Sequence, residues 1–444
     1  MTKPITLTIP PSLWKGEQKQ TIMTTNKNLK SWIEVAPDSD FPIQNIPFGV
    51  FKTKLGGDAR CASRIGDYVI DLSEMASLGY FDDLKFDISV FFEEKLNSFM
   101  ALGKSTTNAV RNRIAEVFSV ENEDLQHNAE NRALVLFKLE EVEMMLPIDI
   151  GDYTDFYSSV EHATNVGKMF RDPNNALLPN WKHIPVGYHG RSSSIVVSGT
   201  DIHRPKGQVK PNDESQPIFT ASRLMDFELE MAFVTGGKSN LGDHISVEGA
   251  DEYIFGMMIF NDLTARDIQK WEYVPLGPFL GKNFGSVLSP WIITMEALGP
   301  FRVAGPTQDP KVLPYLEFEG ERNYDINLSV CLQPEGGEPT TVCKSNHKYL
   351  YWNVAQQLAH QTVNGCNINT GDLYASGTIS GPTEDSFGSM LELSWGGKKT
   401  ITLNNGEERK FINDNDTIIM KAYSEKDGLR IGFGECVTKI LPTK

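Results

Sequence analysis

Residues 226–234 read Asp-Phe-Glu-Leu-Glu-Met-Ala-Phe-Val, and polar and apolar side chains alternate along the first six positions. Side chains on a β-strand point to opposite faces in turn, so this alternation predicts a strand. Asp226, Glu228 and Glu230 would share one face, and the apolar residues between them would share the other. Like charges on one face repel unless the face is solvated or a cation neutralises it. The stretch therefore predicts a strand that is either a solvated edge or part of a cation site.

Segments of strand length and composition recur around this stretch. They are rich in β-branched and aromatic residues and are separated by glycine and proline, as is typical of strands and turns. One helix is expected near residues 346–361, where apolar residues recur at helical spacing. We therefore predict a mainly β fold with some α structure. The strand-like segments are residues 48–51, 67–72, 194–198, 254–262, 326–332 and 417–422.

The composition changes near residue 147. Residues 88–145 are richer in Glu, Leu, Ala and Asn, which favours helices, and Pro147 ends this run because a residue before proline disfavours helical backbone. We therefore predict an N-terminal domain over residues 31–147 and a C-terminal catalytic domain over residues 148–444. Residues 1–30 lack the apolar core of a signal peptide, and we expect a disordered extension there. A transit peptide and translation from Met23 are the alternatives.

Charge and cysteine content exclude several classes of protein. The 444 residues carry 42 Lys and Arg against 58 Asp and Glu, a net charge of −16. This charge does not suit nucleic acid or an anionic membrane surface, and no apolar run approaches the roughly 20 residues that span a bilayer. The five cysteines form no C-x-x-C pair, which argues against a disulfide framework and a thiolate zinc site. We expect a reducing compartment and a cytoplasmic location.

Carboxylates and a histidine outside the alternating stretch are further candidates for a site. Asp262 ends an apolar run, so it is either the cap of a following helix or a cation ligand. Asp155 lies in a loop that leads to His162. Ser158 and Glu161 have the spacing of a capping box, which predicts that His162 lies in the first turns of a helix. The helix dipole there lowers the pKa of a histidine and favours its neutral, basic form.

Other polar residues lie among glycines, where the backbone can approach a ligand closely. Gly277 to Lys282 has some likeness to a phosphate-binding loop. It is one residue short, and Asn283 stands where Ser or Thr is required, so we exclude that motif. The remaining candidates in such settings are Arg171, Tyr188 and Thr378.

Several long motifs together resemble the fumarylacetoacetase family. The resemblance runs from about Trp32 to Pro442. Its main carriers are Gly-Asp-Tyr-Thr-Asp-Phe-Tyr-Ser-Ser at 151–159, His-Ala-Thr-Asn-Val-Gly at 162–167, Glu-Leu-Glu-Met-Ala at 228–232, Trp-Glu-Tyr-Val-Pro-Leu-Gly-Pro-Phe-Leu-Gly-Lys at 271–282, Ala-Ser-Gly-Thr-Ile-Ser-Gly at 375–381 and Ser-Phe-Gly-Ser-Met-Leu-Glu-Leu-Ser-Trp at 386–395.

The resemblance implies a small SH3-like barrel domain, a large C-terminal mixed β-sandwich roll and a homodimer. It also implies two metal ions, with Asp155, Glu228, Glu230 and Asp262 as ligands for Ca²⁺, and Asp262, Lys282 and Ser286 as ligands for Mg²⁺. Ser286 stands where the family usually has threonine, which leaves the affinity of the Mg²⁺ site open.

The implied activity is hydrolysis of the C–C bond of a 1,3-diketone, fumarylacetoacetate, to fumarate and acetoacetate in tyrosine and phenylalanine catabolism. His162 would be the base, oriented by Glu392. Arg266, Gln269 and Lys282 would stabilise developing negative charge. The implied substrate contacts are Tyr157, Arg171, Tyr188, Gln269, Tyr273 and Thr378. Two alternatives remain: a 2-oxo acid hydratase or decarboxylase on the same scaffold, and a non-catalytic metal-binding protein.

Overall fold

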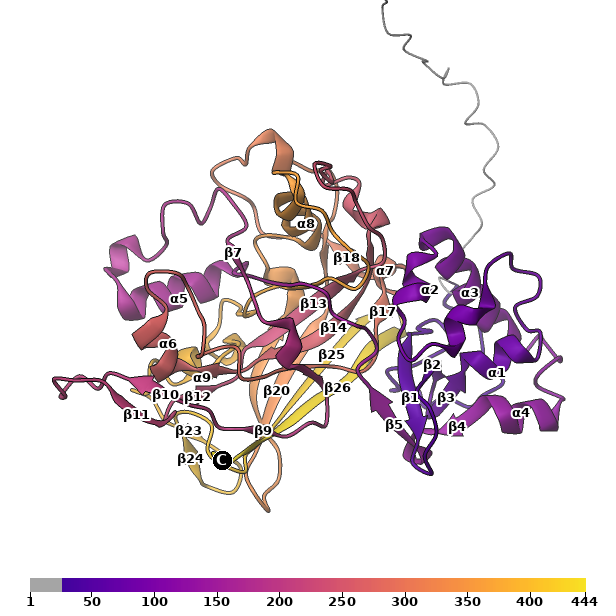
Figure 1. Ribbon diagram of the computed structural model, residues 1–444, viewed down its shortest axis with the longest axis horizontal. Helices are drawn as coiled ribbons and strands as arrows, with labels where there is room; N and C mark the ends of the chain where they lie inside the picture. The colour runs from indigo at the N-terminus through magenta and orange to yellow at the C-terminus, as the bar shows by residue number, and fades with distance from the viewer. Residues whose placement is uncertain (1–25) are drawn as a thin grey trace, which may run out of the picture.

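The alternating stretch lies at the centre of an eight-stranded mixed sheet in the computed structural model, which describes residues 26–444 (Figure 1). The strand order is β7-β6-β22-β13-β14-β16-β8, and β17 also pairs with β14. The strands are β6 (Tyr153–Phe156), β7 (Gly187–His189), β8 (Ile195–Val197), β13 (Leu229–Thr235), β14 (Ile254–Asp262), β16 (Ser286–Leu288), β17 (Ile293–Thr294) and β22 (Leu373–Ala375).

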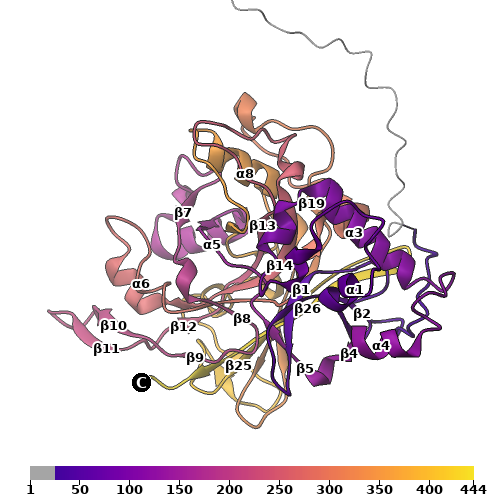
Figure 2. The ribbon, with the colours of Figure 1, turned by 45° about the vertical axis from the view of Figure 1, so that its right-hand side comes forward.

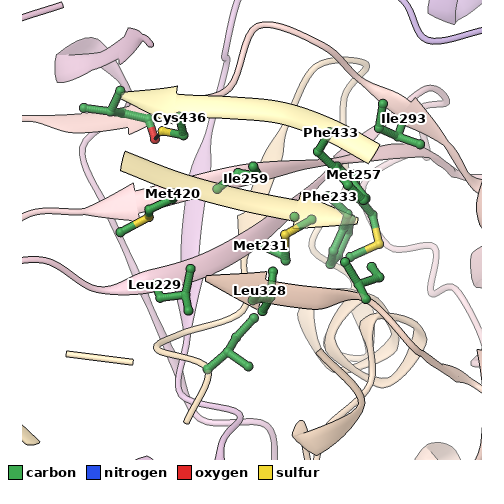
Figure 3. Close-up of a cluster of buried hydrophobic side chains, with 14 of the residues drawn as sticks. Leu229, Met231, Phe233, Met257, Ile259, Ile293, Leu328, Met420, Phe433 and Cys436 are labelled. Carbon is green, nitrogen blue, oxygen red and sulfur yellow. Dashed lines mark hydrogen bonds between the residues drawn. The ribbon is translucent and has the colours of Figure 1, made fainter. Parts of the chain in front are cut away.

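One face of this sheet packs against a second, five-stranded sheet. Leu229, Met231 and Phe233 point from β13 into the core that the two sheets share (Figure 3). The predicted alternation of apolar side chains is therefore confirmed. The second sheet has the order β21-β20-β25-β26-β9, with β9 (Ile202–His203), β20 (Asn327–Gln333), β21 (Thr340–Asn346), β25 (Thr417–Lys426) and β26 (Leu429–Leu441).

The other face of the eight-stranded sheet packs against the N-terminal part of the chain (Figure 2). Ala232 and Val234 belong to the same buried cluster as Phe48 and Phe99. Because β13 is buried along its whole length, the solvated-edge alternative is wrong. The N-terminal sheet is antiparallel, with the order β4-β3-β2-β1-β5: β1 (Gly49–Thr53), β2 (Arg60–Ile65), β3 (Tyr68–Asp71), β4 (Leu136–Lys138) and β5 (Val142–Met145).

Helices occupy only part of the region where the composition predicts them. Residues 136–138 and 142–145 form strands β4 and β5 instead, because they pair with β3 and β1, and a short 3-10 helix over residues 139–141 joins them. The helix expected over 346–361 begins at Val354, where Asn353 caps it. The α-helices are α1 (Leu72–Ser77), α2 (Asn97–Ala101), α3 (Lys104–Val117), α4 (Ala129–Val135), α5 (Val160–Phe170), α6 (Arg266–Glu272), α7 (Met295–Leu298), α8 (Val354–Thr362) and α9 (Met390–Leu393).

Short paired strands complete the described fold. β10 (Lys206–Val209) and β11 (Ile218–Ala221) form an antiparallel hairpin that projects beside α6 (Figure 1). The other pairs are β12 (Met225–Asp226) with β15 (Thr264–Ala265), β18 (Arg302–Val303) with β19 (Asn323–Tyr324), and β23 (Ile401–Thr402) with β24 (Glu408–Arg409). The fold is mixed, with strands predominating.

All five cysteines are free thiols, as the absence of a disulfide framework predicts. Among residues 26–444, no helix is both long and apolar enough to cross a membrane. Most of the predicted N-terminal extension, residues 1–25, lies outside the described residues.

Candidate active site

Three buried carboxylates meet where neighbouring strands of the large sheet end. Asp155 lies on β6, Glu230 on β13 and Asp262 at the end of β14, and β22 lies between β6 and β13. One oxygen from each carboxylate lies within 4.8 Å of the others. Asp155 Oδ1 and Glu230 Oε1 have no hydrogen-bond partner among the described residues. These three residues are called the acidic cluster below.

The acidic cluster has the chemistry of a site for a hard cation. Burial raises the pKa values of Asp155 and Glu230 well above their usual range, and the neighbouring carboxylates add to the effect. Oxygen ligands of this kind suit Ca²⁺ or Mg²⁺, and a cation would remove the repulsion that raises these pKa values. The two unpaired oxygens are therefore suitable ligand atoms.

Glu228 is engaged by two cations rather than by the acidic cluster. Its carboxylate forms ion pairs of 2.8 Å with Arg266 and with Lys282. Lys282 Nζ also lies 2.5 Å from Asp262 Oδ2, so this ammonium bridges Glu228 and the acidic cluster. Burial alone would raise the pKa of Glu228, but Lys282 and Arg266 outweigh burial and lower it.

The predicted Mg²⁺ ligands Lys282 and Ser286 both contact Asp262. Burial would lower the pKa of Lys282, but Asp262 and Glu228 raise it, so the amine stays protonated. A protonated amine has no lone pair, and Lys282 could therefore ligate a metal only through its backbone carbonyl. The Ser286 hydroxyl donates a hydrogen bond to Asp262 Oδ1 at 3.0 Å.

Two predicted helix caps differ from the structure. Asp262 caps no helix, because it remains in β14, paired with Ser286 on β16, and α6 starts after Ala265 without a side-chain cap. The cap of α5 is Ser159 rather than Ser158: its hydroxyl accepts a hydrogen bond from the backbone N–H of His162 at 3.1 Å. His162 nevertheless lies in the first turn of α5, as predicted.

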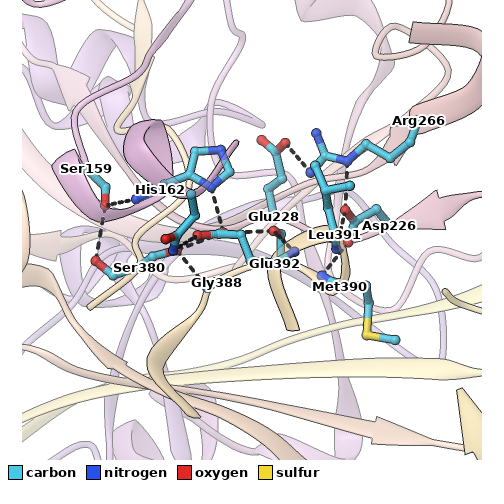
Figure 4. Close-up of polar contacts among 12 residues, drawn as sticks. Ser159, His162, Asp226, Glu228, Arg266, Ser380, Gly388, Met390, Leu391 and Glu392 are labelled. Carbon is cyan, nitrogen blue, oxygen red and sulfur yellow. Dashed lines mark hydrogen bonds and ion pairs between the residues drawn. The ribbon is translucent and has the colours of Figure 1, made fainter. Parts of the chain in front are cut away.

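His162 and Glu392 form a buried pair (Figure 4). Nδ1 of His162 lies 2.6 Å from Oε2 of Glu392. Glu392 lies on the short helix α9 and not on the strand that its neighbours suggest. Burial would raise the pKa of Glu392, but His162 and the hydrogen bonds that this carboxylate accepts lower it. Glu392 is thus held as a carboxylate that accepts from Nδ1 and leaves Nε2 to take a proton.

Three further donors to Glu392 were not predicted. Asn165 donates to Oε1 at 3.0 Å, and the hydroxyls of Ser380 and Ser389 each donate to Oε2 at 2.9 Å. Two of them have a local signal. Asn165 follows His162 by three positions on α5, so both lie on one helix face, and Ser389 has capping-box spacing to Glu392. Ser380 has no such signal.

Three of the predicted substrate contacts lie beside buried residues of the site. Tyr157 packs its ring edge-on against His162, with centroids 5.2 Å apart. Tyr188 hydrogen-bonds to Asp155, and the buried hydroxyl of Thr378 has no partner among the described residues. These three therefore lie among the residues of the buried site.

Of the other predicted contacts, Gln269 is half-buried, whereas Tyr273 and Arg171 are exposed. Gln269 on α6 accepts a hydrogen bond from Arg266 at 3.3 Å, and Tyr273 after it is half exposed. Arg171 is exposed, and its guanidinium donates to the carbonyl of Ala176 at 2.8 and 3.1 Å. The structure therefore brings Gln269 to the buried site through Arg266, whereas Arg171 and Tyr273 remain accessible to solvent.

Comparisons with known proteins cover nearly the whole chain. Residues 44–147 match the model described as fumarylacetoacetase N-terminal, and residues 152–441 match the model described as fumarylacetoacetate (FAA) hydrolase C-terminal. Fumarylacetoacetase of Dictyostelium discoideum is 56% identical over 93% of this chain and 98% of its own length. Fumarylacetoacetase of Homo sapiens is 54% identical over 93% of this chain and 99% of its own length.

A solved structure agrees at the level of the fold. A fumarylacetoacetate hydrolase from Exiguobacterium antarcticum is similar with a TM-score of 0.50 and 17% sequence identity, over 89% of this chain and 99% of that chain. This likeness concerns architecture, whereas the two family models and the close relatives concern the sequence itself. The chain therefore belongs to the fumarylacetoacetate hydrolase family.

Proposed function

We propose that this protein is a metal-dependent hydrolase that cleaves the C–C bond of fumarylacetoacetate to fumarate and acetoacetate. The observation that carries this proposal is the buried His162–Glu392 pair beside Glu228 and its two cations. Such a site combines a base for water with positive charge for the carbanion that C–C cleavage releases. The relatives named fumarylacetoacetase support the choice of substrate.

His162 acts as the base in this proposal. Glu392 accepts a hydrogen bond from Nδ1–H and so fixes the tautomer whose Nε2 is unprotonated. As Nε2 takes a proton from the attacking water, the carboxylate of Glu392 stabilises the imidazolium that forms. The departing carbanion later recovers a proton, which the same imidazolium can supply.

Positive charge and hydrogen-bond donors stabilise the enolate that leaves. Arg266 and Lys282 are buried cations that the carboxylates around them hold in fixed positions. Preorganised donors of this kind lose little energy to reorganisation when charge develops. Gln269, bound to Arg266, would add a neutral donor. Tyr157, Tyr188, Tyr273 and Thr378 would contact the substrate, and Arg171 would bind a substrate carboxylate.

The acidic cluster is the proposed metal site. Asp155, Glu230 and Asp262 would hold Ca²⁺. Glu228 would be a fourth ligand if its carboxylate turned away from Arg266 and Lys282. Asp262 with Ser286 and the backbone of Lys282 would hold Mg²⁺. When bound, such a cation supplies Lewis-acid polarisation and a template for the two diketone oxygens.

The finer features of the resemblance belong to the same proposal. They are an SH3-like barrel over residues 31–147, a β-sandwich roll over residues 148–444, a homodimer and a cytoplasmic location. The antiparallel N-terminal sheet and the two facing C-terminal sheets support the first two. The family models, which end at 147 and begin again at 152, support the boundary.

The decisive assay follows loss of diketone absorbance with purified protein, together with fumarate release, with and without added Ca²⁺. Stoichiometric fumarate and acetoacetate support the proposal. A hydratase or decarboxylase on the same scaffold would leave the diketone unchanged and turn over a 2-oxo acid instead. A non-catalytic metal-binding protein would bind the cation and turn over neither substrate.

A further inference from the structure

Asp226 is a buried carboxylate that none of the proposed chemical steps uses. It ends β12, two positions before Glu228, and its side chain is fully inaccessible to solvent. A charge is costly to bury unless its oxygens are paired, so the partners of such a group indicate its role.

Asp226 binds two different parts of the candidate site (Figure 4). Its Oδ2 accepts a hydrogen bond from Nε of Arg266 at 2.7 Å. Its two oxygens also accept from the backbone N–H groups of Met390 at 2.6 Å and Leu391 at 3.1 Å. These are the first two residues of α9, and the third is Glu392. One carboxylate therefore joins a proposed charge-stabilising cation to the backbone that carries the partner of His162.

The two groups that Asp226 joins, Arg266 and the turn carrying Glu392, each have a further ion-pair partner. Arg266 also pairs with Glu228, and Glu392 also pairs with His162. Asp226 thus lies between Arg266, which pairs with Glu228, and the turn of α9 that carries the partner of His162. In a site of this kind, a displacement of about 1 Å can lower the rate on the order of 10²-fold.

We propose that Asp226 is a positioning residue, which holds the Arg266 guanidinium and the α9 turn in fixed relation so that His162–Glu392 and Arg266 act on the same substrate. This inference rests on the proposed function. It requires no contact between Asp226 and the substrate.

A buried ion pair of the same kind elsewhere in the chain provides a matched control. Asp416 is also buried, and it accepts two hydrogen bonds from Arg409, at 2.8 and 2.9 Å. It also accepts one from the backbone N–H of Asn413 at 2.8 Å. Asp416→Asn therefore removes the same charge from a similar environment without touching the candidate site.

The kinetic experiment compares Asp226→Asn with Asp416→Asn. Both substitutions are expected to lower the melting temperature. Only Asp226→Asn should lower kcat, by about 10- to 100-fold, with KM changed much less. The double variant Asp226→Asn/Glu392→Gln should have a kcat close to that of Glu392→Gln alone. Any of three results overturns the proposal. They are a kcat of Asp226→Asn equal to that of the wild type, a loss of kcat in Asp416→Asn as large as that in Asp226→Asn, and losses of kcat in the two single variants that multiply in full in the double variant.

A spectroscopic measurement tests the same point without any substrate. In protein labelled with ¹⁵N-histidine, the short Nδ1–H bond from His162 to Glu392 should give a downfield proton resonance. The resonance should shift or disappear in Asp226→Asn and stay in place in Asp416→Asn. If the wild type does not hydrolyse fumarylacetoacetate, the proposed function fails, whereas this resonance still tests Asp226.

A second variant covers the case in which Asp226→Asn does not fold. Asp226→Asn/Arg266→Gln removes both charges of the buried pair and leaves no unpaired cation. Its reference is Arg266→Gln, which retains Asp226 and its two backbone hydrogen bonds to α9. A resonance displaced in the double variant relative to Arg266→Gln supports the positioning role, and an identical resonance overturns it.

Discussion

Nδ1 of His162 lies 2.6 Å from Oε2 of Glu392, although 230 positions separate the two residues in sequence. Ser380 forms hydrogen bonds with both of the segments that carry this pair. Its carbonyl accepts a hydrogen bond from Ser159, the cap of the helix that carries His162, and its hydroxyl donates to Glu392. The helix that carries His162 and the side chain of Glu392 are therefore both hydrogen-bonded to Ser380, so the separation of the pair does not depend only on their attraction for each other.

The pair should behave as one unit in catalysis. Glu392→Gln keeps the shape of the side chain but removes the charge that stabilises the imidazolium. It should lower kcat by a factor on the order of 10²–10⁴ and change KM much less. His162→Ala should cost a similar factor, and the double variant should lose little more than either single variant. Steady-state kinetics on the wild type, the two single variants and the double variant provide a double-mutant cycle on kcat, and melting temperatures are recorded for each protein.

A purely structural Glu392 would give a different pattern. Glu392→Gln would then lower the melting temperature and leave kcat near the wild-type value. The effects of the two substitutions on kcat would also multiply. Either result would remove the pair from the proposed mechanism.

Arg171 should affect substrate binding rather than the chemical step. Arg171 is exposed, and among residues 26–444 its guanidinium donates hydrogen bonds only to the carbonyl of Ala176, so it can turn toward a substrate carboxylate. Arg171→Met should raise KM with little change in kcat, equivalent to about 1.5–3 kcal/mol for one charge-assisted contact. Arg191 is also exposed, and it donates to Ser193, so Arg191→Met provides the control, in which KM should not change.

A methyl ester of the substrate separates two explanations of that result. The ester should show a similar penalty with the wild type and little further penalty with Arg171→Met. If the two penalties add in full, Arg171 contacts something other than the carboxylate.

Local patterns predicted the strands well because alternation is a property of a few neighbouring residues. Leu229, Met231 and Phe233 share a buried face for this reason. The same patterns fail where a segment is too short. Leu-Glu-Leu-Ser at 391–394 alternates like a strand, yet residues 390–393 form one helical turn, which the Ser389 cap and Asp226 favour.

The site itself depends on contacts that local patterns do not carry. Asp155 and Ala375 are paired across the parallel strands β6 and β22, and no periodicity in either strand predicts that neighbour. The family motifs supplied the grouping of Asp155, Glu230 and Asp262 instead. Residues 136–138 and 142–145 show the reverse case, because pairing with β3 and β1 outweighs their helix-favouring composition.

His347 should make the fold sensitive to acid. It is buried against Tyr324, and neither ring nitrogen makes a hydrogen bond of good geometry with a described residue. Burial lowers its pKa to about 4, and the backbone of Tyr324 offsets only part of this. Between pH 6.5 and 4 the unfolded chain binds a proton that the folded chain does not, so stability falls as the pH falls. At about 1.4 kcal/mol per pH unit, the loss reaches roughly 3 kcal/mol.

His347→Leu should remove that contribution. The melting temperature of this variant should fall less than that of the wild type between pH 7 and pH 5. His127 is exposed, so His127→Gln should follow the wild-type curve. If both variants lose stability as steeply as the wild type, His347 is not buried as a neutral group.

Removal of the metal should lower both activity and stability. Three carboxylates of the acidic cluster repel one another when no cation is bound. Thorough chelation should therefore abolish turnover and lower the melting temperature, and added Ca²⁺ or Mg²⁺ should restore both. A ligand at 100 times its Kd stabilises a folded protein by about 2.7 kcal/mol, which a thermal melt resolves readily. Full activity in a sample shown by elemental analysis to be metal-free would contradict the metal assignment.

Metal affinity should rise with pH, and the metal-free protein should lose stability over the same range. The pKa values of Asp155 and Glu230 are raised in the folded protein. At a pH between the ordinary carboxyl pKa and the raised value, the folded state therefore holds protons that the unfolded state has lost. Stability without metal therefore falls as the pH rises, and a binding cation must displace these protons. Calorimetric titration with Ca²⁺ in two buffers of different ionisation enthalpy should detect their release. Glu230→Gln mimics one protonated carboxyl, so its metal-free melting temperature should depend less on pH and it should release fewer protons. If the variant and the wild type release equal numbers of protons, Glu230 is not a ligand.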